Sequence, residues 1–128
     1  MLLKGKTPEI VRQISLILNE LDQRDDVASV VLSTVDGLGM TTDNPNTERI
    51  AAVAGLITEA VQQVRTILSL QEECWEIVLR LEDGVSLLFY PFFAGDSRLI
   101  LIVQFKQEIA YKRLLSQTVQ AIQQIMEN

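Results

Sequence analysis

The chain has 128 residues, a net charge of -6, one cysteine and no histidine. This length predicts a single domain over residues 1–128 with a substantial hydrophobic core, and the acidic balance argues against nucleic acid or an anionic membrane surface as the main partner, since both need a basic patch. The cysteine and histidine counts exclude an intramolecular disulfide and the commonest metal ligands and general bases.

The first predicted element is a helix that starts at Thr7-Pro8-Glu9. Threonine is a favourable N-cap, proline suits the first helical position, and a carboxylate there faces the positive end of the helix dipole. A charged segment, 23–26, ends the helix. The apolar residues of this helix recur at helical spacing: Ile10, Ile14, Ile17, Leu18 and Leu21.

A β-hairpin is predicted from Ser29 to Thr42, in the sequence SVVLSTVDGLGMTT. Asp36-Gly37 lies between apolar, β-branched runs, which favours a two-residue type I′ turn between two short strands. A hairpin of this length is marginal in water, so other elements must cover its apolar face.

A second helix is expected to begin between Asn44 and Glu48, in a segment rich in turn and capping residues. Its apolar arc is about 160° wide, whereas a helix on one sheet needs only a little over 100°. The excess lies on a flank with small residues that would let another backbone come close, so we interpret it as a subunit interface. The sheet-facing stripe holds Ile50, Val53, Ala54, Ile57, Val61, Val64 and Leu68, and the flank holds Ala52, Leu56, Ala60 and Ile67.

Three strands are predicted between Cys74 and Phe105. Residues 75–82 alternate apolar and polar, as in a half-buried strand, whereas 85–93 and 99–105 are apolar at nearly every position, as in central strands covered on both faces. A last helix carries an apolar face between Tyr111 and Ile125. The predicted fold is α/β (α+β), in the order α-β-β-α-β-β-β-α, with a five-stranded, mainly antiparallel sheet and helices on both faces.

This order of elements, with SVVLSTVDGLGMTT in the hairpin and EIVLRLEDGVSLLFYPFFAGDSRLILIVQF in the later strands, resembles the roadblock family of dynein-light-chain-like domains over nearly the whole chain. The resemblance implies the roadblock (profilin-like) fold. It also implies a homodimer or heterodimer, in which a strand at 75–81 and the second helix pair across a twofold axis. The candidate interface residues are therefore Ala52, Leu56, Ala60, Ile67, Trp75, Ile77 and Leu79.

Members of this family regulate or scaffold Ras-like small GTPases, or serve as cargo-adaptor subunits of dynein. The resemblance therefore implies a non-catalytic homodimeric regulator of a Ras-like small GTPase that acts by binding and reshaping it. The alternative is a passive scaffold or adaptor that leaves nucleotide turnover unchanged. We expect no enzymatic activity and no cofactor, because the sequence shows no nucleophile-base pair and no metal set.

Short motifs that suggest other chemistry are outweighed by simpler interpretations. Gly5-Lys6-Thr7 matches the tail of a phosphate loop but lacks the upstream glycine and strand, and the Gly37 and Gly39 pair fits a turn better than a nucleotide cradle. The acidic pairs do not have calcium-loop spacing, so solvated ends of elements are the simpler explanation: Asp25-Asp26, Glu72-Glu73 and Glu82-Asp83.

Arg49, Arg65 and Arg98 could in principle act as arginine fingers in a GTPase site, but solvated surface arginines are the more common case. Trp75 fits either a binding hot spot or, more often, a core or dimer-edge anchor. No stretch approaches the length of a membrane span or has the pattern of a secretory signal. We therefore expect a cytoplasmic protein without membrane insertion.

Overall fold

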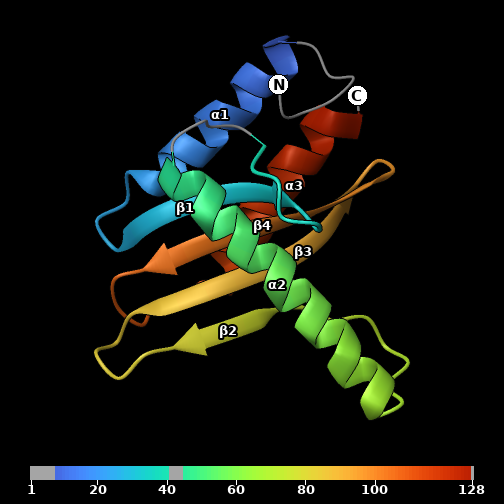
Figure 1. Cartoon of the computed structure of the whole chain (residues 1–128). Coiled ribbons are helices and arrows are strands. Elements are labelled where there is room, and N and C mark those ends of the chain that lie inside the picture. Colours follow the sequence, from blue (N-terminus) through green and yellow to red (C-terminus); the bar gives the residue numbers. More distant parts are fainter. Residues whose placement is uncertain (1–7, 41–44, 128) are drawn as a thin grey trace.

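The computed structural model describes residues 8–40 and 45–127, except the side chain of residue 45, so the predicted N-cap Thr7 lies outside the described part. In chain order the elements are α1 (Pro8–Asp22), β1 (Val27–Thr34), α2 (Pro45–Ile67), β2 (Ile77–Arg80), β3 (Ser86–Ala94), β4 (Ser97–Phe105) and α3 (Lys112–Glu127). The strands form one antiparallel sheet in the order β1-β4-β3-β2. Helix α2 crosses one face of this sheet, and α1 and α3 lie beside each other on the opposite face (Figure 1).

The sheet separates two hydrophobic clusters, because successive side chains of a strand point to opposite faces. The larger cluster lies under α1 and α3 and includes Leu32, Leu101 and Leu115, whereas the smaller one lies under α2 and includes Ala54 and Ile102. Residues of β3 and β4 contribute to both clusters. The prediction that these two strands are central and covered by helices on both faces is therefore confirmed for most of their length.

The predicted five-stranded sheet is wrong for the described residues, where the sheet has four strands. The chain does reverse at Asp36-Gly37, but the returning segment forms only one bridge, between Ser33 and Gly39. The Met40 N–H also donates to the Leu32 carbonyl at 2.9 Å, and both side chains are buried in the cluster under α1 and α3, but the described residues form no further strand here. Residues 41 and 42 of the predicted strand lie outside the described part.

The turn itself differs from the predicted type I′. The backbone N–H of Thr34 donates to the carbonyl of Leu38 at 2.9 Å, and that of Gly37 donates to the carbonyl of Thr34 at 3.1 Å. Three residues therefore form the loop, and Gly37 has a φ of +96°. A three-residue loop needs positive φ at only one position, which glycine adopts at low cost.

Strand β2 is shorter than predicted and begins at Ile77, which pairs with Phe89. If this register continued toward the N-terminus, Trp75 would lie opposite Pro91. Proline has no N–H to donate to a neighbouring strand, which explains why the pairing stops before Trp75. Trp75 consequently lies outside the sheet, and Pro91 lies where β3 has no neighbour on that side among the described residues.

Helix α2 is seated on the sheet by a backbone contact between two glycines. A Cβ atom on Gly55 would lie 3.1 Å from the Asp36 carbonyl oxygen and 3.3 Å from the Gly37 Cα. A Cβ on Gly37 would lie 3.1 Å from the Ala51 carbonyl oxygen. Both glycines therefore let the turn after β1 pack directly on the helix backbone.

The C-terminus of α2 ends in a Schellman motif. The Leu70 N–H donates to the Arg65 carbonyl at 2.8 Å, and the Ser69 N–H donates to the Thr66 carbonyl at 3.3 Å. Ser69 has a φ of +55° and is the only non-glycine residue with positive φ in the described ranges. This conformation costs serine about 1 kcal/mol, because its Cβ crowds the backbone.

Replacing Gly55 with valine should lower the free energy of unfolding by about 2 kcal/mol, since overpacking against a backbone neighbour that cannot move away costs this much. Urea denaturation followed by circular dichroism measures the change. Glu59→Val is the matched control, because Glu59 is exposed one turn further along α2. Equal stability of the two variants would contradict the glycine contact.

Replacing Ser69 with glycine should raise the free energy of unfolding by about 1 kcal/mol by removing the Cβ crowding at positive φ. The same change at Ser15, inside α1, should instead lower it by about 0.5 kcal/mol, because glycine is a poor helix former. Thermal denaturation of both variants tests this difference in sign. A loss of stability in Ser69→Gly would show that the helix does not end as described.

Candidate functional site: an apolar surface on α2 and β2

The wide apolar arc of α2 is divided in the structure into a buried stripe and an exposed flank. Ala51 and Ala54 are fully buried against the sheet, whereas Leu56 is 69% exposed. Val53 and Val64, predicted to face the sheet, are exposed together with the flank. The exposed apolar flank of α2 thus consists of Ala52, Val53, Leu56, Ala60, Val64 and Ile67.

The direction of α2 across the sheet explains why this flank is uncovered. The buried residues of the helix all lie in its first half: Thr47, Ala51 and Ala54. Its last turns extend diagonally past the strands in Figure 1, although Val61 still faces Ile77 and Ile100 across a small cavity. Ile57 marks the boundary, because it packs against the cluster under α2 while its neighbour Leu56 is exposed.

Strand β2 adds an open sheet edge to the same region. It pairs with β3 on one side, and no described strand pairs with its other side. Ile77 is half-buried and packs against the cluster under α2, whereas Leu79, two residues further on, is exposed. An edge strand with exposed apolar side chains is a template for pairing with another chain. The α2–β2 surface is defined here as the exposed flank of α2 together with Ile77 and Leu79.

Two side-chain contacts hold β2 to the segment before α3. The Tyr111 hydroxyl donates to Glu76 Oε1 at 3.2 Å, and Arg80 forms an ion pair with Glu108. Burial, and then the nearby Glu76 carboxylate, raise the pKa of Tyr111, so its hydroxyl stays protonated at neutral pH. These contacts connect both ends of β2 to the segment before α3.

The predicted interface residues do not all lie on one surface. Ala52, Leu56, Ala60, Ile67 and Leu79 are exposed, and Ile77 is half-buried. Trp75 is also exposed, but it precedes β2 and lines a groove beside β3 and α3. Contact of any of these residues with a second subunit stays a prediction.

Two of the three arginines expected to be solvated are in fact largely buried. The side chains of Arg65 and Arg98 are only 16% and 26% exposed, and both pair with Glu73 Oε2, at 3.5 and 3.2 Å. Arg49 is exposed, and its guanidinium donates to the Asn46 side chain at 3.4 Å. Sequence reasoning missed the pairing of Arg65 and Arg98 with Glu73, because it joins the end of α2 to the start of β4.

The described part of the chain contains no cluster of three or more His, Cys, Asp or Glu side chains placed to hold a metal ion. Cys74 is half-buried, and its thiol lies 3.6 Å from the Glu76 carbonyl oxygen. A hydrogen bond from Arg24 lowers the pKa of Asp26, so this acid is held in an ion pair.

None of the helices in the described ranges is long and apolar enough to cross a membrane.

Sequence reasoning also missed an aromatic groove of about 400 Å³ beside β3. Phe93 was expected to be covered on both faces, yet it is 58% exposed at the rim of this groove. The uniform apolar pattern of residues 85–93 conceals this exposure. The only available signal was Pro91, whose missing N–H marks the point where a neighbouring strand must stop.

Comparison with known proteins finds solved structures similar to the chain. No family model and no curated protein matches the sequence. The Roadblock/LC7 domain from Streptomyces avermitilis aligns with a TM-score of 0.67 and 19% identity over 86% of this chain and 92% of that one. The gliding protein MglB from Thermus thermophilus aligns with a TM-score of 0.73 and 15% identity over 99% and 98% of the two chains.

A further MglB structure, described as having a tetrameric arrangement, aligns with a TM-score of 0.71 and 14% identity over 99% of this chain and 97% of that one. The fold implied by the sequence resemblance is confirmed by these three alignments, which cover most or nearly all of the chain. The chain therefore has the fold of the Roadblock/LC7 domains and of MglB.

Proposed function

We propose that the chain forms one roadblock-like domain over residues 1–128, which dimerises with a second copy and regulates a Ras-like small GTPase in the cytoplasm. It does so by binding and reshaping the GTPase, without a cofactor or chemistry of its own. The observation that supports this proposal most strongly is the α2–β2 surface, an exposed apolar helix flank beside an open sheet edge, in a chain with the roadblock fold.

The dimer follows from the physical requirements of this surface. A twofold axis beside β2 would let the β2 strands of two copies pair, which would satisfy the open edge on both. The same axis would bring the α2 flanks together and remove Leu56 and Ile67 from water. Ala52 and Ala60 lie on this flank, and their small side chains permit close approach of the helices. One MglB structure is described as tetrameric, which supports association between chains of this fold.

The regulatory part of the proposal is based on the sequence resemblance to roadblock proteins, whose members act on Ras-like GTPases. Arg65 and Arg98 are already paired with Glu73, which argues against their insertion into a GTPase site. The described residues also hold no cluster of three or more His, Cys, Asp or Glu side chains that could bind a metal ion. Binding that changes the conformational equilibrium of the GTPase is therefore the favoured mechanism.

Replacing Leu56 with arginine should convert the dimer to a monomer. The change would leave a charge unpaired in a desolvated contact, which costs about 3 kcal/mol or more. Light scattering over a range of protein concentrations measures the effect. Leu16→Arg is the matched control, because Leu16 is an exposed leucine on α1, outside the α2–β2 surface. A Leu56→Arg protein as dimeric as Leu16→Arg would contradict this interface.

Adding the purified protein to its partner GTPase should change GTP hydrolysis or nucleotide exchange by about tenfold, which corresponds to about 1.4 kcal/mol of activation free energy. Phosphate release and the dissociation of a fluorescent nucleotide measure these two rates. Leu56→Arg should reduce the effect, whereas Leu16→Arg should retain it.

Binding without any change in either rate would favour the scaffold function instead. Absence of both binding and rate changes, for every Ras-like GTPase encoded with the protein, would overturn the regulatory proposal. The dimer is tested separately by light scattering, so its outcome does not depend on finding the right GTPase.

A further inference from the structure

The aromatic groove lies apart from the α2–β2 surface, along the part of β3 that β2 does not cover. It is about 400 Å³ in volume, a size typical of small-ligand sites, and runs between α3 and the segment 73–75. The residues that matter for its chemistry are Glu73, Trp75, Pro91, Phe93, Arg98 and Gln123.

The groove exposes two aromatic side chains to water. Trp75 is 77% exposed and Phe93 is 58% exposed, and both line the groove together with Pro91 and Val119. Burying an aromatic side chain is strongly favourable, and large exposed apolar groups that gather in one place mark binding sites. The groove therefore favours a ligand that covers these rings.

The backbone at this edge is closed to the addition of a strand. Pro91 has no N–H to donate, and the carbonyl of Phe93 accepts a hydrogen bond of 2.7 Å from Gln123 Nε2. A ligand must consequently be recognised by the side chains around the groove, and the edge of the sheet does not contribute a ladder of hydrogen bonds.

The charged residues beside these rings carry a surplus of positive charge. Arg65 and Arg98 are largely buried and share a single carboxylate, that of Glu73, whose side chain is 66% exposed. The Nε of Arg65 is buried and has no hydrogen-bond partner. Two partly exposed arginine side chains with one exposed counter-ion form a site where an incoming carboxylate could replace Glu73.

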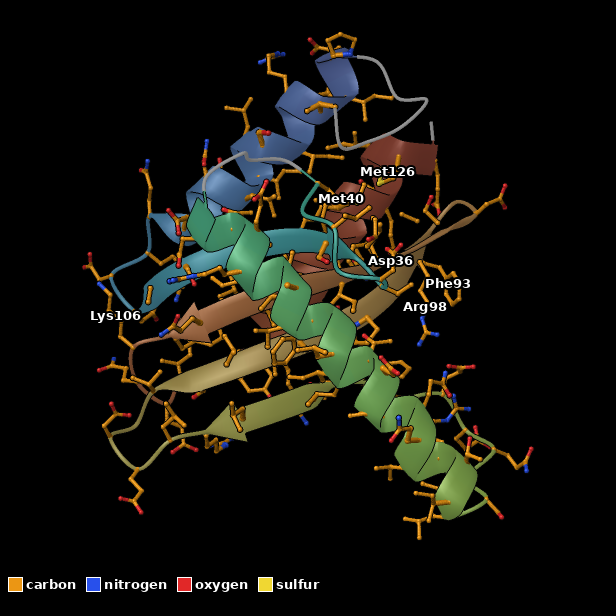
Figure 2. The ribbon with its side chains drawn as sticks, viewed as in Figure 1. Asp36, Met40, Phe93, Arg98, Lys106 and Met126 are labelled. Carbon is orange, nitrogen blue, oxygen red and sulfur yellow. The ribbon has the colours of Figure 1, made fainter. Side chains whose placement is uncertain are left out.

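The aromatic and cationic groups of the groove are in direct contact. The guanidinium of Arg98 lies over the ring of Phe93, with its Cζ atom 5.7 Å from the ring centroid. Figure 2 shows this pair at the end of the β3–β4 hairpin, in the part of the molecule where Asp36 also lies. A ligand that fits both groups must carry an apolar ring and a negative charge only a few atoms apart.

We propose that the groove binds an acidic segment of a partner protein in which an aromatic residue is followed by a residue with a carboxylate. The aromatic ring inserts between Trp75 and Phe93, and the carboxylate pairs with Arg98 in place of Glu73. This is a second interaction surface, separate from the α2–β2 surface, and it does not depend on the proposed dimer.

Trp75 is the only tryptophan of the chain, so its fluorescence reports directly on occupancy of the groove. The probe is the capped peptide acetyl-Gly-Phe-Asp-Gly-amide, and its counterpart with asparagine in place of aspartate is the matched control. The aspartate peptide should shift the emission of Trp75 saturably and bind about tenfold more tightly than the asparagine peptide, because a charged hydrogen bond to arginine is lost in the control.

Two substitutions should change this affinity in opposite directions. Arg98→Gln should weaken binding of the aspartate peptide about tenfold, whereas Glu73→Gln should strengthen it about threefold by removing the competing carboxylate. Arg12→Gln, which removes an exposed carboxylate-paired arginine of α1, should have no effect. Circular dichroism shows whether each variant is folded. If Arg98→Gln does not fold, the Glu73→Gln variant still tests the proposal.

Equal binding of the two peptides would overturn the proposal, as would weaker binding by Glu73→Gln or no saturable response up to about 5 mM peptide. The monomeric variant Leu56→Arg should bind the aspartate peptide as the wild type does. Loss of binding in Leu56→Arg together with retention in Arg98→Gln would place the peptide on the α2–β2 surface and would also overturn the proposal.

Discussion

Pairing of β1 with β4 is the interaction on which the rest of the structure depends. It joins residues 27–34 to residues 99–105 and makes β1 one edge of the sheet, with β2 at the other. Strand β4 occupies one side of β1, and residues 38–40 form a single bridge on its other side. The same strand order leaves β2 as an open edge, which the proposed dimer would close.

The position of α2 follows from this sheet and from the glycine contact between Gly37 and Gly55. The contact holds the first half of the helix on the sheet, where Ala51 and Ala54 are buried. The last turns then extend beyond the strands, and the apolar flank that faces away from the sheet remains exposed along the helix. An apolar flank of this extent is unfavourable in water and favours association.

The segment between α2 and β2 connects two surfaces with different physical character. On one side lies the apolar α2–β2 surface, where burial of leucine and isoleucine would drive association. On the other lies the aromatic groove, where the largely buried Arg65 and Arg98 share the exposed carboxylate of Glu73. The Schellman motif at Ser69 turns the chain between them. A dimer that uses the first surface would leave the second available to another partner.

Local pattern by itself determined the helices, the reversal of the chain at Asp36-Gly37, the apolar strands and the over-wide arc of α2. These features depend on the 3.6-residue and 2-residue periodicities and on the φ angles that glycine adopts, which are properties of neighbouring residues. The number of strands, the early end of β2, the exposure of Phe93 and the pairing of Arg65 and Arg98 with Glu73 were decided by tertiary structure alone. Each depends on which distant segment packs alongside, and a one-dimensional pattern does not contain that information.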